Sequence, residues 1–380
     1  MKKIYFDYAS TTPADPAVMQ AMEPYFFEHF GNASSPHALG REAKKAVEDA
    51  RQELAGFIAA HPEEVVFTSG ATESNNQAIF GVARHLKEKG DHVIVSRIEH
   101  PSVYEPVESL QKEGFQVTYL DVDKTGLVNP DDVKKAVTDQ TILIAVMHAS
   151  NEIGTLQPVQ AIGKIAREKN ISFLVDAVQT VGHIPVDVND LNCDLLSFSA
   201  HKFYGPKGVG ALYIRKGTPL KSFLLGGDQE RGRRAATQNV PGIVGLGKAI
   251  ELCRQKMPEE MRIQAALRDR LIEEISARIK DVVLNGHAVN RLPNNVHFSF
   301  SSVQGEALLM SLDMEGIAAS QGSACTSGAL EPSRVLRAIG LSDSLAYGAL
   351  RLTIGRWTKE EDIDYVSAKL PPIIERLRKI

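Results

Sequence analysis

The chain has 380 residues, of which 43% are hydrophobic and 24% charged, and its formal net charge is −4. This composition is ordinary for a soluble globular protein with a large core, and the charge gives no general attraction to nucleic acid or to an anionic membrane. No stretch approaches the roughly 20 apolar residues of a membrane span, and the first residues contain no apolar signal-peptide core. We therefore expect a cytoplasmic protein that binds neither membrane nor nucleic acid directly.

Short apolar runs alternate with amphipathic segments over the first two thirds of the chain. The runs are rich in β-branched residues and apolar on both faces, which is typical of buried strands. Between them, apolar residues recur at helical spacing, as in residues 37–58. This alternation predicts an α/β fold with a mostly parallel seven-stranded sheet covered by helices. The predicted strands are residues 65–68, 92–96, 117–120, 141–147, 171–175, 194–198 and 210–214.

The pattern changes after about residue 255. A long charged helix is predicted over residues 257–279, a strand within residues 296–301, and a terminal amphipathic helix from Lys359. We interpret this change as the start of a second, smaller α+β domain.

Polar residues follow several of the predicted strands, where ligands of open α/β sheets gather. After the first strand, free backbone amides at Ala71 and Thr72 could hold a phosphate at a positive helix end. An ordinary glycine turn with an N-cap is an equal alternative there. His100 follows the second strand, where a structural histidine is the plainer interpretation. Asp176 follows the fifth strand with Gln179 three residues on, and such a carboxylate could merely cap the next helix.

The sixth strand runs into SAHKFYGPKG, which places Ser199, His201 and Lys202 at a strand exit. A lysine alone would be an ordinary surface residue. A lysine for a Schiff base, a carboxylate for the ring nitrogen and a phosphate cup together fit pyridoxal phosphate. Lys202 is the better lysine because Lys207 follows a Gly-Pro turn. Asp176 would keep the ring nitrogen protonated, so that the ring can accept electrons from a bond broken at the substrate Cα.

The three cysteines, Cys193, Cys253 and Cys325, are odd in number and far apart. They lack C-x-x-C spacing, which argues against a disulfide framework and against a metal site. Cys325 lies in SQGSACTSG, among serines and glycines that favour an exposed, bendable backbone over a core. We expect a free reactive thiol on a mobile loop there.

Nine motifs occur in the order of one known family across nearly the whole chain. They resemble the cysteine desulfurases, which are pyridoxal-phosphate enzymes of fold type I with class V aminotransferase architecture. The resemblance implies a homodimer with two active sites at the subunit interface, and a small domain built from both chain ends. We therefore expect a large cofactor-binding domain over residues 16–255, and a small domain over residues 1–15 and 256–380 that carries the Cys325 loop. The motifs are FDYASTTP, GNASSPHALG, TSGATESNN, EHPSV, NEIG, VDAVQT, SFSAHKFYGPKG, GGDQERGRRAATQNV and SQGSACTSGALEPSRVLRAIGL.

The resemblance also implies a role for each candidate residue. Lys202 would hold the cofactor, Asp176 would face its ring nitrogen, and Gln179 would bond its phenolic oxygen. His100 would stack on the ring and move protons. The other implied roles belong to Ala71, Thr72, Ser199 and His201 at the cofactor phosphate, to Thr237 reaching the phosphate from the partner subunit, and to Asn151 and Arg351 at the substrate carboxylate.

Four positions depart from the family's usual motifs. They leave every residue with an implied role in place, and they bear on loop packing and on the phosphate contact near Thr237. They are Ser150, Asp228, Ala236 and Gln238.

The implied reaction converts L-cysteine to L-alanine. The thiolate of Cys325 would attack the substrate sulfur, become a persulfide and pass the sulfur to an acceptor thiol. The acceptor would be an iron–sulfur cluster scaffold or a tRNA-thiolation enzyme. A free thiol titrates near about 8.5, so Cys325 needs activation by an acid/base such as His100 or by cationic surroundings. The alternatives are a selenocysteine lyase, a transaminase of the same fold, and a catalytically silent partner-binding subunit.

Overall fold

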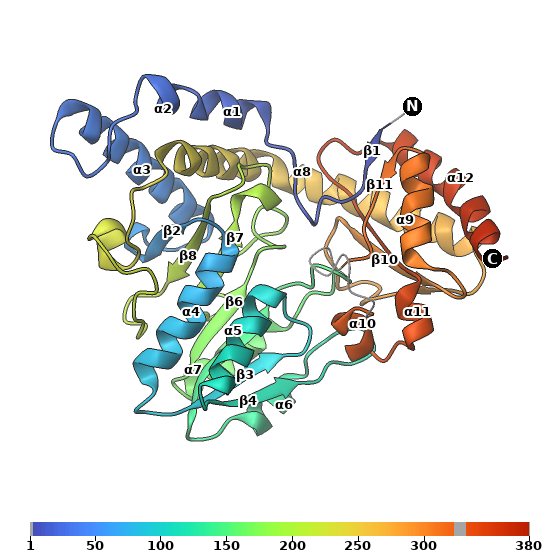
Figure 1. Cartoon of the computed structure of the whole chain (residues 1–380), viewed down its shortest axis with the longest axis horizontal. Helices are drawn as coiled ribbons and strands as arrows, with labels where there is room; N and C mark the ends of the chain where they lie inside the picture. Colours follow the sequence, from blue (N-terminus) through green and yellow to red (C-terminus); the bar gives the residue numbers. More distant parts are fainter. Residues whose placement is uncertain (1–2, 323–331, 380) are drawn as a thin grey trace.

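A seven-stranded sheet forms the centre of the larger part of the molecule (Figure 1). The structure is a computed structural model and describes residues 3–322 and 332–379. The strand order is β2-β8-β7-β6-β5-β3-β4; β8 is antiparallel to both neighbours and the other neighbouring pairs are parallel. The predicted mostly parallel sheet is thus confirmed. The strands are β2 (Val65–Thr68), β3 (His92–Ser96), β4 (Gln116–Leu120), β5 (Thr141–Met147), β6 (Ser172–Asp176), β7 (Leu195–Ser199) and β8 (Gly210–Ile214).

Each predicted strand matches an observed strand to within one residue at either end. The prediction that residues 117–120 are buried on both faces is wrong, however. Strand β4 lies at the edge of the sheet beside β3, where Gln116 is exposed and the next three residues are half-buried. An apolar, β-branched run does not reveal whether a strand has one neighbour or two.

Helices cover both faces of this sheet. Side chains alternate along each strand, so Phe173 of β6 packs on the face that contacts Leu54 of α3, while Leu174 packs on the face that contacts Ile79 of α4. Helices α7 and α8 also pack on the Phe173 face, and α5 packs on the Leu174 face. The helices of this part are α1 (Pro16–Met22), α2 (Pro24–Phe27), α3 (Ala38–Phe57), α4 (Ala71–Leu86), α5 (Pro101–Lys112), α6 (Pro130–Ala136), α7 (Val159–Glu168) and α8 (Val240–Arg278), with 3-10 turns at η1 (Pro62–Glu64), η2 (Ala200–Lys202) and η3 (Gln229–Gly232).

A second, separate core joins the two ends of the chain. Ile4 and Phe6 pack there with apolar side chains from residues 267–374. Strand β1 pairs parallel with β11, and the antiparallel strands β12, β10 and β9 form a three-stranded sheet. The elements are β1 (Ile4–Tyr5), β9 (Val282–Leu284), β10 (Asn295–Phe300), α9 (Gly305–Met314), β11 (Ile317–Ala318), α10 (Arg334–Ala338), α11 (Asp343–Tyr347), β12 (Ala349–Thr353) and α12 (Glu360–Leu377).

Helix α8 connects the two cores and passes from one to the other (Figure 1). It has 39 residues and begins at Val240, so the prediction of a helix confined to residues 257–279 is too short. Its first half is rich in small and apolar residues that pack against the large sheet, and it carries fewer charged residues than the second half, on whose charges the prediction relied. The proposed domain boundary near residue 255 falls inside this helix, and the division remains our proposal.

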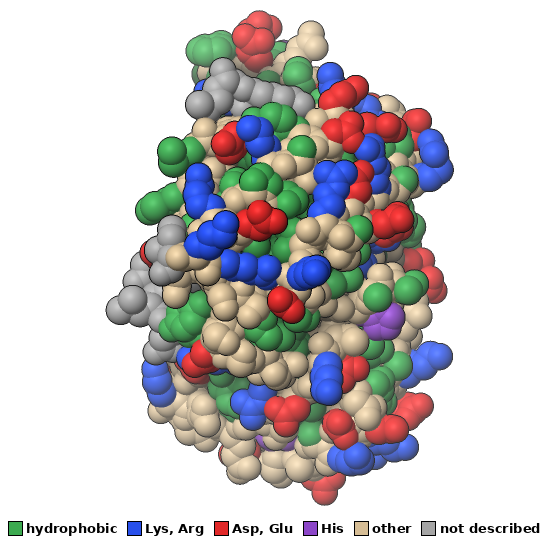
Figure 2. All heavy atoms as spheres, turned by 90° about the vertical axis from the view of Figure 1, so that its right-hand side faces the viewer, with side chains coloured by type: hydrophobic (Ala, Val, Ile, Leu, Met, Phe, Trp, Pro, Cys, Tyr) green, Lys and Arg blue, Asp and Glu red, His purple; other side chains and the backbone are tan. Residues whose placement is uncertain are grey.

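The surface carries charges of both signs. On the face seen in Figure 2, basic and acidic side chains are interspersed among apolar ones. Within residues 3–322 and 332–379, no helix is both long and apolar enough to cross a membrane. Those same residues contain no cluster of three or more His, Cys, Asp or Glu side chains that could hold a metal ion.

Candidate active site

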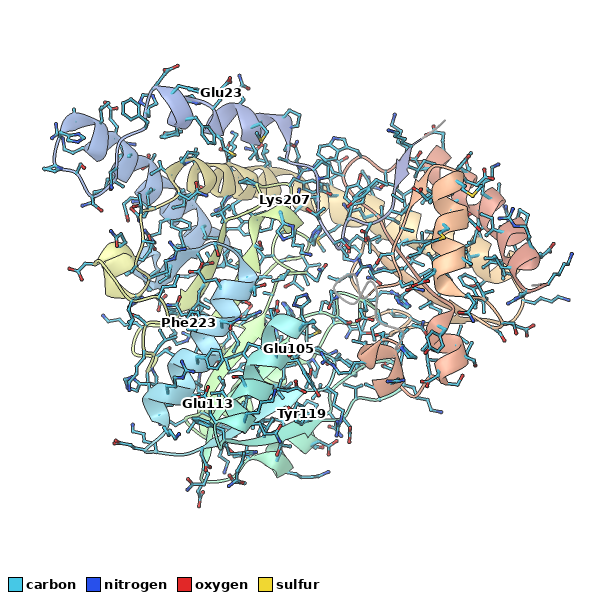
Figure 3. The ribbon with its side chains drawn as sticks, viewed as in Figure 1. Glu23, Glu105, Glu113, Tyr119, Lys207 and Phe223 are labelled. Atoms are coloured by element: carbon cyan, nitrogen blue, oxygen red, sulfur yellow. The ribbon has the colours of Figure 1, made fainter. Side chains whose placement is uncertain are left out.

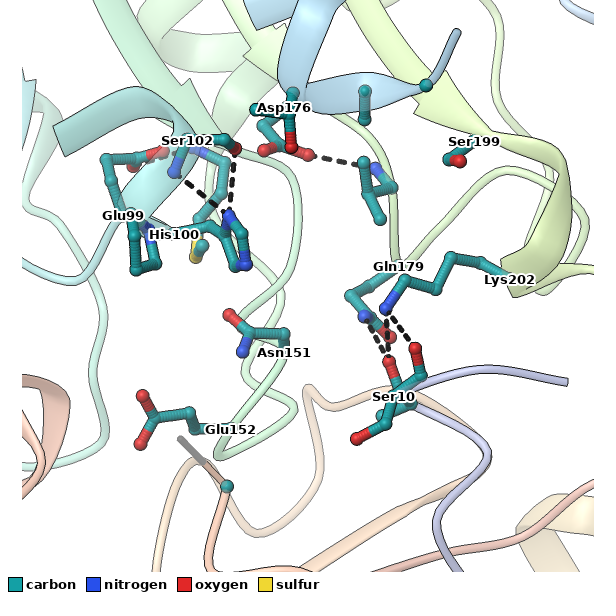
Figure 4. Close-up of a pocket in the computed structure, with 18 of the residues that line it drawn as sticks. Ser10, Glu99, His100, Ser102, Asn151, Glu152, Asp176, Gln179, Ser199 and Lys202 are labelled. Carbon is teal, nitrogen blue, oxygen red and sulfur yellow. Dashed lines mark hydrogen bonds between the residues drawn. The ribbon is translucent and has the colours of Figure 1, made fainter. Parts of the chain in front are cut away.

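A cavity of about 1230 Å³ lies where the large sheet faces the second core. It opens at the carboxyl ends of the central strands, and Figure 4 shows the polar side chains that project into it. Thr237 lines a separate, smaller hollow of about 200 Å³. Cys325 lies outside the described residues. The predicted site residues that line the large cavity are Ala71, Thr72, His100, Asn151, Asp176, Gln179, Ser199, His201, Lys202 and Arg351.

Lys202 ends the 3-10 turn that follows β7, and its side chain extends across the cavity (Figure 4). Its Nζ donates hydrogen bonds to the carbonyl oxygens of Ala9, at 2.7 Å, and Ser10, at 2.8 Å. Gln179 donates to the same Ala9 oxygen from Nε2, at 3.1 Å. The first residues of the chain thus position both side chains. Lys207 also lines the cavity, but it is an exposed residue (Figure 3).

Asp176 is the last residue of β6 and is 6% exposed. Its Oδ1 accepts a hydrogen bond from the backbone N–H of Val178, at 3.0 Å, and its Oδ2 accepts one from Nδ2 of Asn75, at 2.9 Å. A carboxylate held in this way can accept hydrogen bonds but donates none. Sequence reasoning missed Asn75, although Asn75 stands one helical turn after Ala71 and therefore shares its side of α4.

His100 is the N-cap residue of α5. Its Nδ1 accepts a hydrogen bond from the backbone N–H of Ser102, at 3.1 Å, and lies 2.8 Å from the Ser102 hydroxyl. Burial lowers the pKa of His100 below its ordinary value, although the charge of Asp176 acts in the opposite direction. The imidazole is therefore neutral near pH 7.

The N-terminus of α4 forms another wall of the cavity. Gly70 precedes it with φ near 155°, a conformation that residues with a Cβ rarely adopt. The backbone N–H groups of Ala71 and Thr72 belong to the first helical turn, where N–H groups lack helical acceptors. Ser199 and His201 line the same cavity. Burial lowers the pKa of His201 to about 4, assisted by the charge of Lys202, so His201 is a neutral hydrogen-bonding group.

Arg351 approaches the cavity from β12 and is 1% exposed. Its Nη1 donates to the carbonyl oxygens of Asn151 and Gly322, at 2.8 and 2.9 Å. Its Nη2 donates to Asp7 Oδ1, at 2.9 Å, and to Ser10 Oγ, at 2.7 Å. Its buried Nε has no hydrogen-bond partner within the described residues, so the guanidinium beside Asn151 can still donate to a carboxylate.

Two buried glutamates in the cavity wall were also missed by sequence reasoning. Glu99 Oε1 accepts hydrogen bonds from Ser96 Oγ, at 2.5 Å, and from the N–H of Met147, at 2.8 Å, and burial raises the pKa of Glu99 to about 8. Glu152 accepts a hydrogen bond from Ser333 Oγ, at 2.5 Å, and burial raises its pKa as well. Glu99 directly precedes His100, and Glu152 directly follows Asn151. Nothing in the sequence indicates that either glutamate is buried.

Two of the three cysteines lie away from the cavity. Cys193 and Cys253 have no exposed surface, and burial raises the pKa of each thiol to about 12. Neither lines the cavity, so neither can provide a thiolate there.

Known proteins match this chain over almost its full length. The Aminotransferase class-V family matches residues 4–366. A protein of Dictyoglomus turgidum named "Cysteine desulfurase IscS" is 55% identical over 379 residues, which cover 100% of this chain and 96% of that protein. The chain belongs to the cysteine desulfurases of the class-V aminotransferase family. A "Cysteine desulfurase IscS" of Methanosarcina thermophila is 50% identical, with 100% of this chain and 94% of the relative covered.

Solved structures of cysteine desulfurases and related proteins have the same fold. A "NIFS-LIKE PROTEIN" superposes with a TM-score of 0.93 at 37% identity, covering 99% of this chain and all of the other. A structure described as "SspA in complex with cysteine" gives a TM-score of 0.84 at 37% identity, covering 94% of this chain and all of the other. The predicted fold-type I architecture is thereby confirmed.

The cofactor of this cysteine desulfurase is pyridoxal phosphate, and the residues of the cavity fit it. The cavity holds a lysine amine at one side, an acceptor-only carboxylate in its depth, and backbone N–H groups at a helix N-terminus. The amine suits the cofactor aldehyde, the carboxylate suits a protonated ring nitrogen, and the N–H groups suit a phosphate. The assignment of each residue to its part of the cofactor remains a prediction.

Proposed function

We propose that this enzyme takes sulfur from L-cysteine, leaves L-alanine, and passes the sulfur through Cys325 to an acceptor thiol. The observation that carries the proposal is that one cavity brings together Lys202, Asp176 and the carboxylate-binding pair Asn151 and Arg351. A related structure was solved with cysteine, which supports cysteine as the substrate. The test is to supply L-cysteine with a reducing thiol and count alanine and sulfide per active site. Equal amounts of both products are expected, and alanine without sulfide would contradict the proposal.

The chain's own residues bind and orient the reacting groups. Lys202 would carry the cofactor, and Asp176 would keep the ring nitrogen protonated because its carboxylate is fixed as an acceptor. When bound, pyridoxal phosphate supplies an electron sink that makes the substrate Cα proton removable. The N-terminus of α4 with Ser199 and His201 would hold the phosphate. Asp176 and Ser199 are buried and Lys202 and His201 are half-buried, so their electrostatic contacts are screened less than those at an exposed surface.

Arg351 would hold the substrate carboxylate, and its loss is expected to weaken cysteine binding. In Arg351→Lys the positive charge remains but the planar fork of donors is lost. We expect KM for L-cysteine to rise by about 10- to 100-fold, because one charge-assisted bidentate contact is worth roughly 1.5–3 kcal/mol. The measurement is steady-state alanine production at varied cysteine concentration. An unchanged KM would remove Arg351 from the substrate site.

Cys325 is our candidate for the sulfur-accepting nucleophile. The other two cysteines are buried with raised pKa values and lie away from the cavity, which leaves Cys325 as the remaining thiol. The thiolate would attack the sulfur of the bound substrate and form an S–S bond as the substrate Cβ–S bond breaks; the electron pair of that bond would stay with the carbon skeleton, which takes up a proton to give alanine. An acceptor thiol would then take the outer sulfur of the Cys325 persulfide by exchange. We further propose that the acceptor is an iron–sulfur scaffold or a tRNA-thiolation enzyme, and that the enzyme acts in the cytoplasm, where free thiols persist.

We also propose that the enzyme is a homodimer in which Thr237 completes the phosphate site of the partner subunit. Thr237 lines a hollow outside the cavity of its own chain, which supports this assignment. The side chain of Glu230, on the loop that leads to Thr237, is held by Arg51 at 2.7 and 3.0 Å and by Gln238 at 2.5 Å. This buried ion pair gives the loop a fixed conformation.

A subunit-mixing experiment tests the shared site. Lys202→Ala and Thr237→Ala homodimers are both expected to be inactive at limiting cofactor. Their heterodimer contains one composite site with an intact Lys202 and an intact Thr237, so mixing should restore up to about half of the wild-type activity per heterodimer. If heterodimers form and no activity returns, Thr237 does not serve the partner's site.

A further inference from the structure

A hydrogen-bond network behind the cavity connects Asp176 to His100 through two residues without an assigned role. Asn75 lies on α4 and has no exposed surface. Its Nδ2 donates to Asp176 Oδ2, at 2.9 Å, and to Ser102 Oγ, at 3.0 Å. Its Oδ1 accepts from Ser197 Oγ, at 2.5 Å. The Ser102 hydroxyl in turn lies 2.8 Å from His100 Nδ1. Every polar atom of the Asn75 side chain therefore has a partner.

The chemistry of these partners fixes where each hydrogen lies. An ionised carboxylate only accepts hydrogen bonds, so the amide NH₂ of Asn75, and not its oxygen, must face Asp176. The second hydrogen of this NH₂ group then points to Ser102 Oγ, so the single Ser102 hydroxyl hydrogen is not taken up by Asn75 and stays available for His100 Nδ1. The backbone N–H of Ser102 donates to the same Nδ1, at 3.1 Å. A nitrogen that accepts from two donors carries no proton of its own.

We propose that Asn75 is a positioning residue, which orients Asp176 directly and, through the Ser102 hydroxyl, fixes His100 as the neutral tautomer with its proton on Nε2. His100 then meets the cavity as a fixed hydrogen-bond donor. In the other neutral tautomer, with the proton on Nδ1, the contact from the backbone N–H of Ser102 that caps α5 would be lost, and the contact with the Ser102 hydroxyl would have to reverse its direction. The proposal rests on the cofactor and substrate site described above and narrows the role of His100 within it.

The groups around His100 agree with a neutral ring. Burial is the main influence on its pKa and lowers it; the positive charges of Lys202 and Arg334 act in the same direction, and Asp176 opposes them. Protonating Nδ1 would also set a new N–H against the backbone N–H of Ser102 and would require the Ser102 hydroxyl to turn away. Asn75 thus influences which ring nitrogen of His100 carries the proton, whereas burial disfavours the charged form of the ring.

The tautomer can be measured without any catalysis. We suggest ¹⁵N-histidine labelling of the cofactor-free protein and NMR of the imidazole nitrogens across the range of about pH 6–8 in which histidines usually titrate, with His100→Gln to identify the signals. The expected result is an unprotonated Nδ1 and a protonated Nε2 throughout. A proton on Nδ1, or ordinary titration of His100, would overturn the proposal. Because this readout needs neither Cys325 nor turnover, it is independent of whether the chain desulfurates cysteine.

A matched pair of variants tests Asn75 itself. Asn75→Leu removes both amide donors, whereas Asn76→Leu makes the same change one residue later, where the half-buried side chain donates a hydrogen bond to the Thr72 carbonyl and none to Asp176 or Ser102. In Asn75→Leu, Asp176 loses one of the two hydrogen bonds that hold its carboxylate, so we expect bound pyridoxal phosphate to dissociate about 10-fold faster. Asn76→Leu should retain the wild-type rate. Equal cofactor release from wild type and Asn75→Leu would contradict the role.

A third variant replaces the amide of Asn75 by a charged acceptor and preserves the size of the side chain. Asn75→Asp replaces the donor by an acceptor, so the Ser102 hydroxyl turns toward it and away from His100. We expect the pKa of His100 to rise in the NMR titration, because a contact that disfavours its protonation is lost and a negative charge is added. Ser102→Ala should raise it less, since the backbone N–H of Ser102 remains. If neither variant moves the His100 titration, the path through Ser102 is wrong, even where Asn75→Leu fails to fold.

Discussion

Cys325→Ser is expected to stop alanine production from L-cysteine while leaving cofactor and substrate binding intact. A serine hydroxyl stays protonated at neutral pH and attacks sulfur poorly, so turnover should fall by about three orders of magnitude or more. Asn151, Arg351 and Lys202 are unchanged, so added cysteine should still shift the absorbance of the bound cofactor. The measurement is paired: the absorbance change on adding cysteine, and alanine release per active site, in wild type and variant.

A transaminase and a selenocysteine lyase, the alternative enzymes, would give different results in these assays. A transaminase needs no enzyme thiol, so a Cys325→Ser transaminase would keep most of its turnover. Cys193→Ala is a matched control, because that thiol is buried and remote from the cavity; its turnover should remain near wild type at temperatures where the protein is folded. If Cys325→Ser makes alanine at a near wild-type rate, the persulfide mechanism is wrong. Repeating the assay with selenocysteine distinguishes a lyase, which would turn over selenocysteine and leave cysteine unused.

The sheet could be predicted from the sequence because its signal is local. Strands such as Thr141–Met147 are continuous apolar runs, and their regular alternation with helices allows few topologies. The edge position of β4 and the early start of α8 could not be predicted in this way. Whether Gln116 meets a neighbouring strand or solvent, and whether a helix continues past a change in composition, depends on contacts between segments far apart in the sequence.

The site residues also fall into two groups: those that their local sequence position indicates, and those whose role depends on contacts with distant segments. Lys202 and Asp176 stand at strand ends next to turn residues, so their position alone indicates a ligand site. Asn75, Glu99 and Glu152 act through buried contacts with residues 27 to 181 positions away in the chain. The place of Asn75 one helical turn after Ala71 is the one local signal among them, and nothing local in the sequence distinguishes the two glutamates from surface polar residues. Their roles emerge only when the tertiary structure shows which atoms they contact.

Lys202→Ala is expected to abolish desulfuration, whereas Lys207→Ala should retain most of it. Both lysines line the cavity, but Lys202 is held at the strand exit by the Ala9 and Ser10 carbonyls, and Lys207 is exposed. Without the Lys202 amine the cofactor can bind only non-covalently, and no amine is positioned to exchange with the substrate, so we expect a loss of about three orders of magnitude or more. Alanine release per bound cofactor, measured at saturating pyridoxal phosphate, separates this loss from weak cofactor binding.

Chemical labelling identifies the same lysine independently of activity. Borohydride reduces the bond between the cofactor aldehyde and a lysine amine, and peptide mapping then locates the modified residue. In wild type the label should lie on Lys202. In Lys207→Ala the label should stay there, because the three contacts that position Lys202 and Gln179 against Ala9 and Ser10 do not involve Lys207. In Lys202→Ala we expect no covalent label, since the exposed Lys207 lacks the carbonyl contacts that orient an amine into the cavity. Labelling of Lys207 in wild type would transfer the cofactor-binding role to it, and the roles of Asp176 and His100 would then have to be reassigned around that second lysine.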